Sequence, residues 1–225
     1  MHVEICCNSV LSARHAQRGG AGRIELCQAL GEGGTTPSAG AIRYCVSQLG
    51  LETRVLVRPR GGDFCYDDEE MAVMLDDIAV ARDCGAHAVV VGFLTPQGDI
   101  DTDKTRRAVE AAAGMEVTFH RAFDDCRHPQ EALEQIIACG CHKLLTSGCH
   151  PTAWEGRTVL KALQQQAAGR IAIIGAAGVT TRNVAALVAE TGLHEVHGSL
   201  KHTVGGLTCT DEEQVREFMK ITKNL

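Results

Sequence analysis

The stretch Val3-Glu4-Ile5-Cys6-Cys7, together with Arg23-Ile24-Glu25-Leu26-Cys27, decides the fold of this chain. Both are short runs in which aliphatic residues alternate with other types, as in a β-strand whose two faces differ. Between them, Ser9 can cap a helix that continues through Ala13 and Ala16. A strand, a helix and a second strand form a crossover unit whose strands are parallel. This first unit therefore predicts an α/β fold.

The same alternation of strand-like and helical segments continues to the end of the chain. The further expected strands are Thr53–Arg58, Ala88–Gly92, Glu116–His120, Lys143–Thr146, Ile171–Gly175 and Glu195–His197. Strict alternation favours parallel strands joined by crossover helices. Eight such units of about 25 residues each make a closed barrel, and the chain of 225 residues is long enough to contain them.

We therefore predict one domain over residues 1–225, a single (β/α)8 barrel of the TIM type. A doubly wound open sheet, which normally has fewer strands, is the alternative. A short helical tail is expected from about residue 202, with a last helix over Asp211–Lys220.

The composition excludes several classes of function. The net charge of -6 is opposite in sign to that of most nucleic-acid-binding domains. No apolar run approaches the roughly 18 residues that span a bilayer, and Met1-His2 lead straight into a strand without a signal peptide. We therefore expect a cytoplasmic protein with no nucleic-acid or membrane partner. In that reducing compartment, most of the 11 cysteines are expected to be buried, reduced hydrophobes.

Strand alternation predicts which side chains face the barrel axis. With the aliphatic residues facing the helices, the interior receives Glu4, Cys6, Glu25, Cys27, Arg58, Thr118, His120, Glu195 and His197. Buried charges are costly unless they are paired or bind something. This interior therefore predicts either an ionic network that only fixes the fold or a functional site. Barrel active sites lie at the C-terminal ends of the strands, where Cys6, Cys27, Arg58, His120 and His197 fall.

The repeated Glu-x-Cys of the first two strands points to a metal. Adjacent strands lie about 4.8 Å apart, so two inward cysteines, Cys6 and Cys27, could share one soft ion. Thiolates favour Cu(I), whereas zinc would need two more ligands, for which His120 and His197 are candidates. Two reduced, metal-free thiols are the alternative.

A second group of cysteines and histidines has the residue types of a zinc site. Its members are Cys139-Gly140-Cys141-His142 and Cys149-His150. A strand separates the two halves, so we expect them at opposite ends of the barrel rather than around one ion.

Arginines, glycines and a histidine after several strands predict an anion-binding, catalytic mouth. Arg58-Pro59-Arg60-Gly61-Gly62-Asp63-Phe64 follows the third strand, and two arginines with two glycines suit a phosphate or carboxylate. Arg121 and Asp124 follow His120, and Asp124 could orient His120 or act as its acid/base partner. The candidate catalytic residues are His120, Asp124, Glu25 and Arg58, and the candidate anion-binding residues are Arg58, Arg60, Arg121, Ser147, Gly148, Gly178 and Ser199. Self-paired charged turns are the alternative.

These blocks resemble the CutC family, the so-called copper homeostasis proteins, over about Val3 to Ser199. The most specific blocks are Arg23-Ile24-Glu25-Leu26-Cys27, Glu32-Gly33-Gly34-Thr35-Thr36-Pro37-Ser38, the Arg58–Phe64 stretch, Thr118-Phe119-His120-Arg121-Ala122-Phe123-Asp124 and Leu145-Thr146-Ser147-Gly148. The resemblance implies a TIM-type barrel, a cytoplasmic homo-oligomer (dimer or tetramer) and a role in copper handling. It also implies that Cys6 and Cys27 match positions proposed for Cu(I) in some members.

Three functions remain open at this point. The first is a copper homeostasis protein with copper(I) as its cofactor, bound by Cys6 and Cys27. The second is an isomerase, lyase or hydrolase that acts on a small anionic or phosphorylated metabolite. The third is a scaffold without catalytic activity, in which the inward polar residues only stabilise the fold.

Overall fold

A computed structural model describes residues 1–225, apart from the side chain of Val204. Eight parallel strands form a closed barrel in sequence order, and β8 pairs with β1 to complete it. The barrel strands are β1 His2–Cys7, β2 Arg23–Leu26, β3 Glu52–Leu56, β4 Ala88–Val91, β5 Glu116–Phe119, β6 Lys143–Thr146, β7 Ala172–Gly175 and β8 Glu195–Gly198. The prediction of a (β/α)8 barrel is confirmed.

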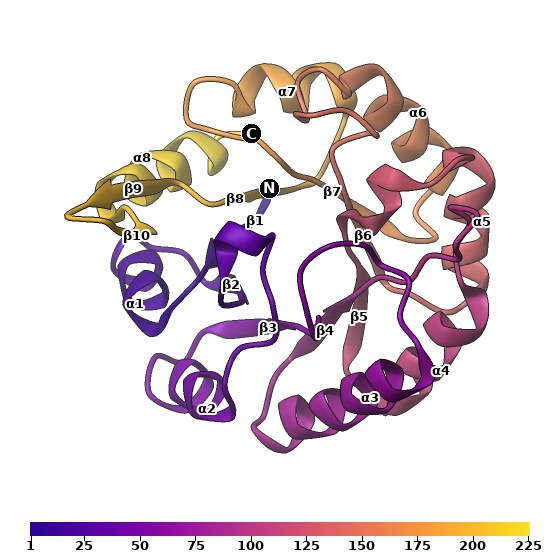
Figure 1. The fold of residues 1–225 in the computed structure, drawn as a ribbon. Helices are drawn as coiled ribbons and strands as arrows, with labels where there is room; N and C mark the ends of the chain where they lie inside the picture. Colours follow the sequence, from indigo (N-terminus) through magenta and orange to yellow (C-terminus); the bar gives the residue numbers. More distant parts are fainter.

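Helices surround the strands, as the view along the barrel in Figure 1 shows. They are α1 Val10–Arg18, α2 Ala39–Ser47, α3 Asp68–Asp83, α4 Thr102–Ala112, α5 Pro129–Ala138, α6 Arg157–Ala167, α7 Val184–Thr191 and α8 Glu212–Thr222, with short 3-10 turns η1 Leu30–Glu32 and η2 Arg121–Asp125. No helix in the described residues combines the length and the apolar character needed to cross a bilayer.

The hydrophobic core is divided between two layers. The large layer lies between strands and helices and contains outward-facing residues such as Ile5, Ile24 and Val55. Inside the barrel are two small apolar clusters, one of Cys6, Cys27, Leu56 and Val90, and one of Leu145, Ile174 and Ala176. The predicted strand alternation therefore holds, and the interior keeps room for polar side chains.

A network of ion pairs fills the barrel interior near the N-terminal ends of the strands. Glu4 Oε2 lies 3.2 Å from Arg23 Nε and 3.3 Å from Arg54 Nε. Arg23 also pairs with Glu195 at 2.7 Å, and Arg54 pairs with Glu116 at 2.6 Å. Glu195 therefore belongs to a structural network, as the alternative interpretation of the interior charges predicts.

The C-terminal region differs from the helical tail expected from about residue 202. Strands β9 (Lys201–Val204) and β10 (Leu207–Thr210) form an antiparallel hairpin before α8 begins. The hairpin docks on α1, where the Thr210 backbone N–H donates to Ser12 Oγ at 3.1 Å (Figure 1). Gly205-Gly206 is a two-residue turn between two short segments in which apolar and polar residues alternate. This pattern is typical of a hairpin, and the prediction of a helical tail overlooked it.

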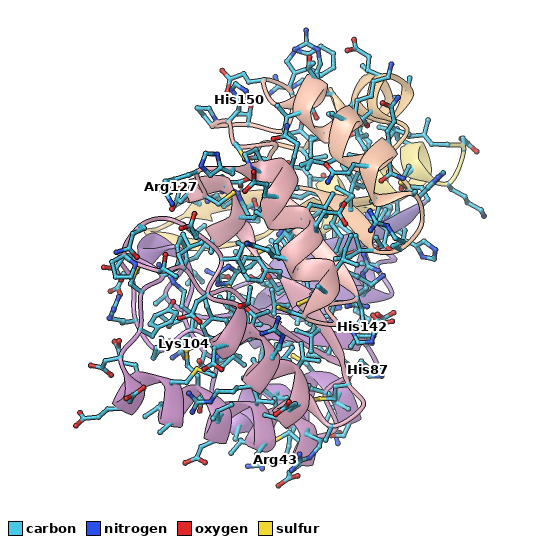
Figure 2. The ribbon with its side chains drawn as sticks, turned by 90° about the vertical axis from the view of Figure 1, so that its right-hand side faces the viewer. Arg43, His87, Lys104, Arg127, His142 and His150 are labelled. Carbon is cyan, nitrogen blue, oxygen red and sulfur yellow. The ribbon has the colours of Figure 1, made fainter. Side chains whose placement is uncertain are left out.

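The two halves of the second cysteine–histidine group lie where the sequence places them. His142 precedes β6, whereas His150 follows it. In the side view of Figure 2, His142 and His87 lie toward the right, and His150, Arg127 and Lys104 lie toward the left. The left side carries the C-terminal ends of the strands, and the candidate site is on that side.

Candidate functional site

A cavity of about 560 Å³ opens at the C-terminal ends of the strands. This volume falls within the range of roughly 300–1,000 Å³ that small-molecule sites occupy. Its lining includes Cys6, Glu25, Cys27, Arg58, Phe64, His120, Arg121, Asp124, Gly178, His197, Ser199 and Lys201. Most of the predicted site residues therefore meet in one space.

Cys6 and Cys27 lie side by side in the wall of this cavity. Both thiols are buried, and their Sγ atoms are 4.0 Å apart. The strand register explains this proximity, because Cys6 is level with Glu25 on β2 and Cys27 follows two residues later. The contact with Cys27, together with burial, raises the pKa of Cys6 well above its usual range. Without a metal, Cys6 is therefore a protonated thiol.

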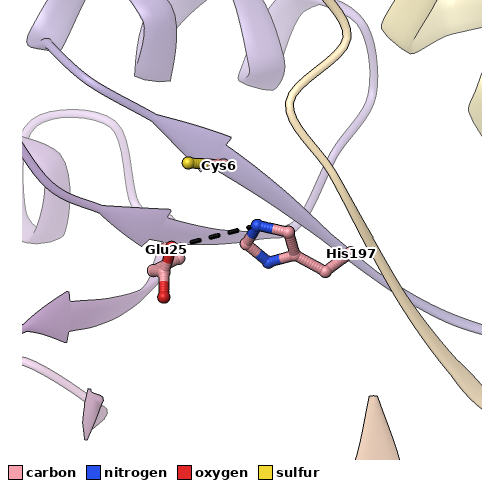
Figure 3. A group of neighbouring side chains, drawn as sticks. All are labelled: Cys6, Glu25 and His197. Carbon is pink, nitrogen blue, oxygen red and sulfur yellow. Dashed lines mark ion pairs between the residues drawn. The ribbon is translucent and has the colours of Figure 1, made fainter. Parts of the chain in front are cut away.

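His197 completes this cluster from the opposite side of β1. The barrel closes with Glu4 level with His197, and His197 Nδ1 lies 2.9 Å from Glu4 Oε1. The other nitrogen, Nε2, is 3.9 Å from Glu25 Oε2. Figure 3 shows the imidazole of His197 directed toward Glu25 and Cys6. One donor atom from each of Cys6, Glu25 and His197 lies within 4.8 Å of the others.

The protonation of this cluster follows from its contacts. Burial opposes a charged imidazole, but the hydrogen bond to the Glu4 carboxylate and the charge of Glu25 outweigh it and raise the pKa of His197 well above its ordinary value. Burial also raises the pKa of Glu25, although His197 partly offsets this. Burial acts in the same direction on Glu4, but His197, Arg23 and Arg54 lower the pKa of Glu4 overall. Glu4 therefore holds His197 in place as an ionised carboxylate.

His120 lies at the end of β5 and is only 5% exposed. Its Nδ1 accepts a hydrogen bond of 3.1 Å from the backbone N–H of Ala122. Its Nε2 has no hydrogen-bond partner among the described residues. Burial and the positive charges of Arg58 and Arg121 lower the pKa of His120 to about 3. His120 is therefore a neutral imidazole at neutral pH.

Asp124 is tied to the loop after β6 rather than to His120. Its carboxylate accepts hydrogen bonds from Thr146 Oγ1, the backbone N–H groups of Ser147 and Cys149, and Arg121 Nε. In the described part of the chain no hydrogen bond joins Asp124 to His120, so the expected orienting contact is absent there. The backbone N–H of Ala122 fixes the imidazole instead.

The arginines after β3 and β5 differ in how much of their charge is free. The Arg58 guanidinium donates to the carbonyl oxygens of Glu32, Gly34 and Gly62, and packs 4.8 Å from the ring centroid of Phe64. Arg58 therefore stabilises the cavity wall and adds a positive charge to the cavity.

Arg60 does not reach the cavity. It pairs with Glu70 at 2.5 Å and with Asp63 at 3.0 Å, and it is absent from the described lining. Arg121 lines the cavity, but its Nε donates to Asp124 at 2.8 Å. The alternative of self-paired charges in the turns thus describes Arg60 well.

The four loop residues predicted to bind an anion divide into two pairs. Gly178 and Ser199 line the cavity after β7 and β8. Ser147 is buried and donates to Asp124 and to the carbonyl of His150, and neither it nor Gly148 is part of the described lining. Gly148 has φ +73, and a Cβ there would lie 2.5 Å from Gly156 O. The close approach of two loops explains this glycine.

Two features of the site depend on contacts that the sequence alone does not show. His197 was expected to face inward, but its fit between Glu4, Cys6 and Glu25 depends on the pairing of β8 with β1. The register of a closed barrel is the signal that could have shown this. Lys201 lines the cavity from the start of β9, and the overlooked hairpin accounts for that omission.

Comparisons with known proteins place the chain among close relatives. The CutC family model matches residues 1–202. A CutC family protein of Porphyromonas gingivalis is 48% identical over 204 residues, covering 91% of this chain and 82% of the relative. One of Bacteroides thetaiotaomicron is 50% identical over 203 residues, covering 89% and 81%. A crystal structure of CutC from Streptococcus agalactiae, provisionally named a copper homeostasis protein, has a TM-score of 0.83 and 33% identity, covering 88% of this chain and 97% of its own.

Proposed function

Since the chain belongs to the CutC family, we propose that it is a copper homeostasis protein that binds Cu(I) through Cys6 and Cys27. The observation that carries the proposal is the 4.0 Å separation of the two Sγ atoms. Two metal–sulfur bonds of about 2.3 Å that meet at about 120° place their sulfurs about 4.0 Å apart. The thiol pair thus has the spacing of two ligands in a three-coordinate site.

The donor set suits a soft ion. Thiolate sulfur favours Cu(I), and an imidazole is an acceptable companion. His197 has a donor atom within 4.8 Å of Cys6, in a group that includes Glu25 but not Cys27, and is the candidate third ligand once the two thiols close around the ion, with Glu4 fixing the ring from Nδ1. Glu25 offers a hard oxygen in the same cluster, and a tetrahedral zinc ion would use it as a fourth ligand.

Cu(I) titration of the reduced protein, with a chromogenic Cu(I) chelator as competitor, tests the proposal. Wild type should hold one tightly bound Cu(I) per chain, and Cys6→Ser/Cys27→Ser should lose it. Cys45→Ser/Cys84→Ser is the matched control, because it also removes two buried thiols but lies in the outer core. Equal stoichiometry in wild type and Cys6→Ser/Cys27→Ser contradicts the proposal. Stronger retention of zinc than of Cu(I) would refute the choice of metal.

We also propose that the protein is a cytoplasmic homo-oligomer, a dimer or tetramer. The 11 free thiols suit a reducing compartment. Val73 and Val80 on α3 and Tyr44 on the neighbouring α2 are large apolar residues that remain 41–52% and 40% exposed, respectively. Light scattering after size exclusion should give a multiple of the 24.0 kDa chain mass, reduced in Val73→Lys/Val80→Lys. A monomeric wild type would contradict this assembly.

A further inference from the structure

We propose that the cavity also binds a small phosphorylated carbonyl compound, whose carbonyl oxygen accepts a hydrogen bond from His120 and whose phosphate lies at the loops after β7 and β8. This ligand would occupy the part of the cavity away from the paired thiols. The inference goes beyond the proposed copper function and does not depend on it.

The proton of His120 is located by its hydrogen bond. Because Nδ1 accepts from the backbone N–H of Ala122, it carries no proton, and the neutral ring must carry its proton on Nε2. Nε2 has no acceptor among the described residues, although His120 is 5% exposed. A buried donor without a partner destabilises the folded protein, so an acceptor supplied by a ligand would relieve a deficit already present.

A neutral imidazole N–H selects the type of ligand atom. It donates to a carbonyl or hydroxyl oxygen and polarises a carbonyl without adding a full positive charge. The ring centroids of Phe64 and His120 are 5.0 Å apart and both residues line the cavity, so the phenyl ring packs beside the imidazole at the ligand's end of the site. Arg58 and Arg121 beside it add a positive potential for an anionic ligand.

The loops after β7 and β8 provide backbone donors for a phosphate. Ala177 and Leu200 have φ of 72° and 41°, a conformation that non-glycine residues rarely adopt. The backbone N–H groups of Gly178 and Ser199 donate to no acceptor in the described part of the chain, and both residues line the cavity. Lys201 lines it as well and has no ion-pair partner among the described side chains. Phosphate sites of such barrels are commonly built from these two loops.

The spacing of the strands limits the size of the ligand. β5 and β7 are separated by one strand, so their ends lie about 10 Å apart at about 4.8 Å per strand. A short sugar phosphate with hydrogen bonds of about 3 Å at each end can bridge this separation. A free phosphate ion reaches only one end.

Nuclear magnetic resonance of ¹⁵N-histidine-labelled protein gives the direct test. Dihydroxyacetone phosphate should shift the Nε2–H signal of His120 at neutral pH in metal-free protein. Propyl phosphate, which has neither a carbonyl nor a hydroxyl oxygen at that position, and inorganic phosphate should leave that signal nearly unchanged. An unmoved signal with saturating dihydroxyacetone phosphate, or equal shifts with all three compounds, overturns the proposal.

Two variants separate the two ends of the ligand. His120→Asn keeps an acceptor for the Ala122 N–H but removes the Nε2 donor, and should weaken dihydroxyacetone phosphate binding about fivefold while sparing propyl phosphate. Lys201→Gln should weaken both phosphorylated compounds by about tenfold at low salt. If neither variant changes either affinity, the site assignment is wrong. A folding defect in His120→Asn leaves the wild-type resonance as the deciding measurement.

Copper and phosphate-ester binding can fail separately. Cys6→Ser/Cys27→Ser should bind dihydroxyacetone phosphate with an affinity within about twofold of wild type, because hydrogen bonds to His120 and Gly178 do not involve the thiols. Loss of ester binding in that variant would contradict two separate subsites, whereas loss of Cu(I) binding alone is the result expected for the proposed function.

Discussion

At the residue scale, the burial of His120 has a free-energy cost that depends on pH. Burial in the native barrel, together with the positive charges of Arg58 and Arg121, keeps the pKa of His120 at about 3. An unfolded chain has no such restriction and takes up a proton near the ordinary histidine value of about 6.5. Each step of acidification below that value therefore favours the unfolded chain.

His120→Asn should accordingly reduce the acid sensitivity of the protein. Between pH 7 and pH 5, wild type should lose about 2 kcal/mol more unfolding free energy than this variant, since only the unfolded histidine becomes protonated. Urea denaturation at both pH values measures the difference. The exposed His150→Asn serves as control and should keep the wild-type pH dependence. An identical pH dependence in His120→Asn would show that His120 does not contribute.

Glu4 provides a second test at this scale. Its buried carboxylate contacts Arg23, Arg54 and His197. Because Glu4→Gln removes this negative charge, the positive charges around it lose their counter-ion. We expect the variant to lose about 3–5 kcal/mol of unfolding free energy, measured by urea denaturation.

Glu134 is the matched surface control for Glu4. It pairs with Arg170 at 2.7 Å, but both side chains are 46% exposed and the pair is screened by solvent, so Glu134→Gln should have little effect on the unfolding free energy. Similar losses in Glu4→Gln and Glu134→Gln would mean that burial of the network contributes little.

At the scale of elements, strand alternation was enough to predict which side chains face inward. The pattern failed for individual loop residues, because alternation does not describe how a loop folds back. Ser147 and Arg60 carry groups that could bind an anion. In the structure, however, Ser147 donates its hydroxyl to Asp124, and Arg60 forms an ion pair with Glu70. The hairpin over residues 201–210 was missed for a related reason, since its short strands pair with each other and lie outside the barrel repeat.

The loop after β6 also yields a prediction. Gly148→Ala would combine φ +73 with a Cβ 2.5 Å from the Gly156 carbonyl oxygen. We expect a loss of more than about 2 kcal/mol in unfolding free energy, because neither backbone can yield freely. Gly31→Ala meets no atom within 4 Å and should be tolerated. Equal stability of the two variants would contradict the close approach of these loops.

At the scale of the whole molecule, most of the hairpin and all of α8 lie beyond the region that the family model matches, which ends at residue 202. They nevertheless cover α1: a Cβ on Gly19 would meet Val215 Cγ1 at 2.5 Å, and Phe218 is fully buried.

A chain ending at residue 200 should therefore expose the apolar face of α1. We expect increased binding of a hydrophobic dye and a melting temperature at least about 5 °C lower than that of the full chain. Unchanged melting would show that the tail is a passive extension. Glu110→Gln, which alters an exposed residue on α4, is a control that should leave dye binding unchanged.

The seam between β1 and β8 has a consequence for biosynthesis. Glu4 and His197 are 193 residues apart, so the partner of Glu4 is synthesised long after Glu4 itself. At about 5–20 residues per second, a ribosome needs on the order of 10–40 s to reach it. During that interval the nascent chain carries Cys6 and Cys27 without the imidazole that completes their cluster. The native cluster of Cys6, Glu25 and His197 therefore forms only after β8 has been synthesised.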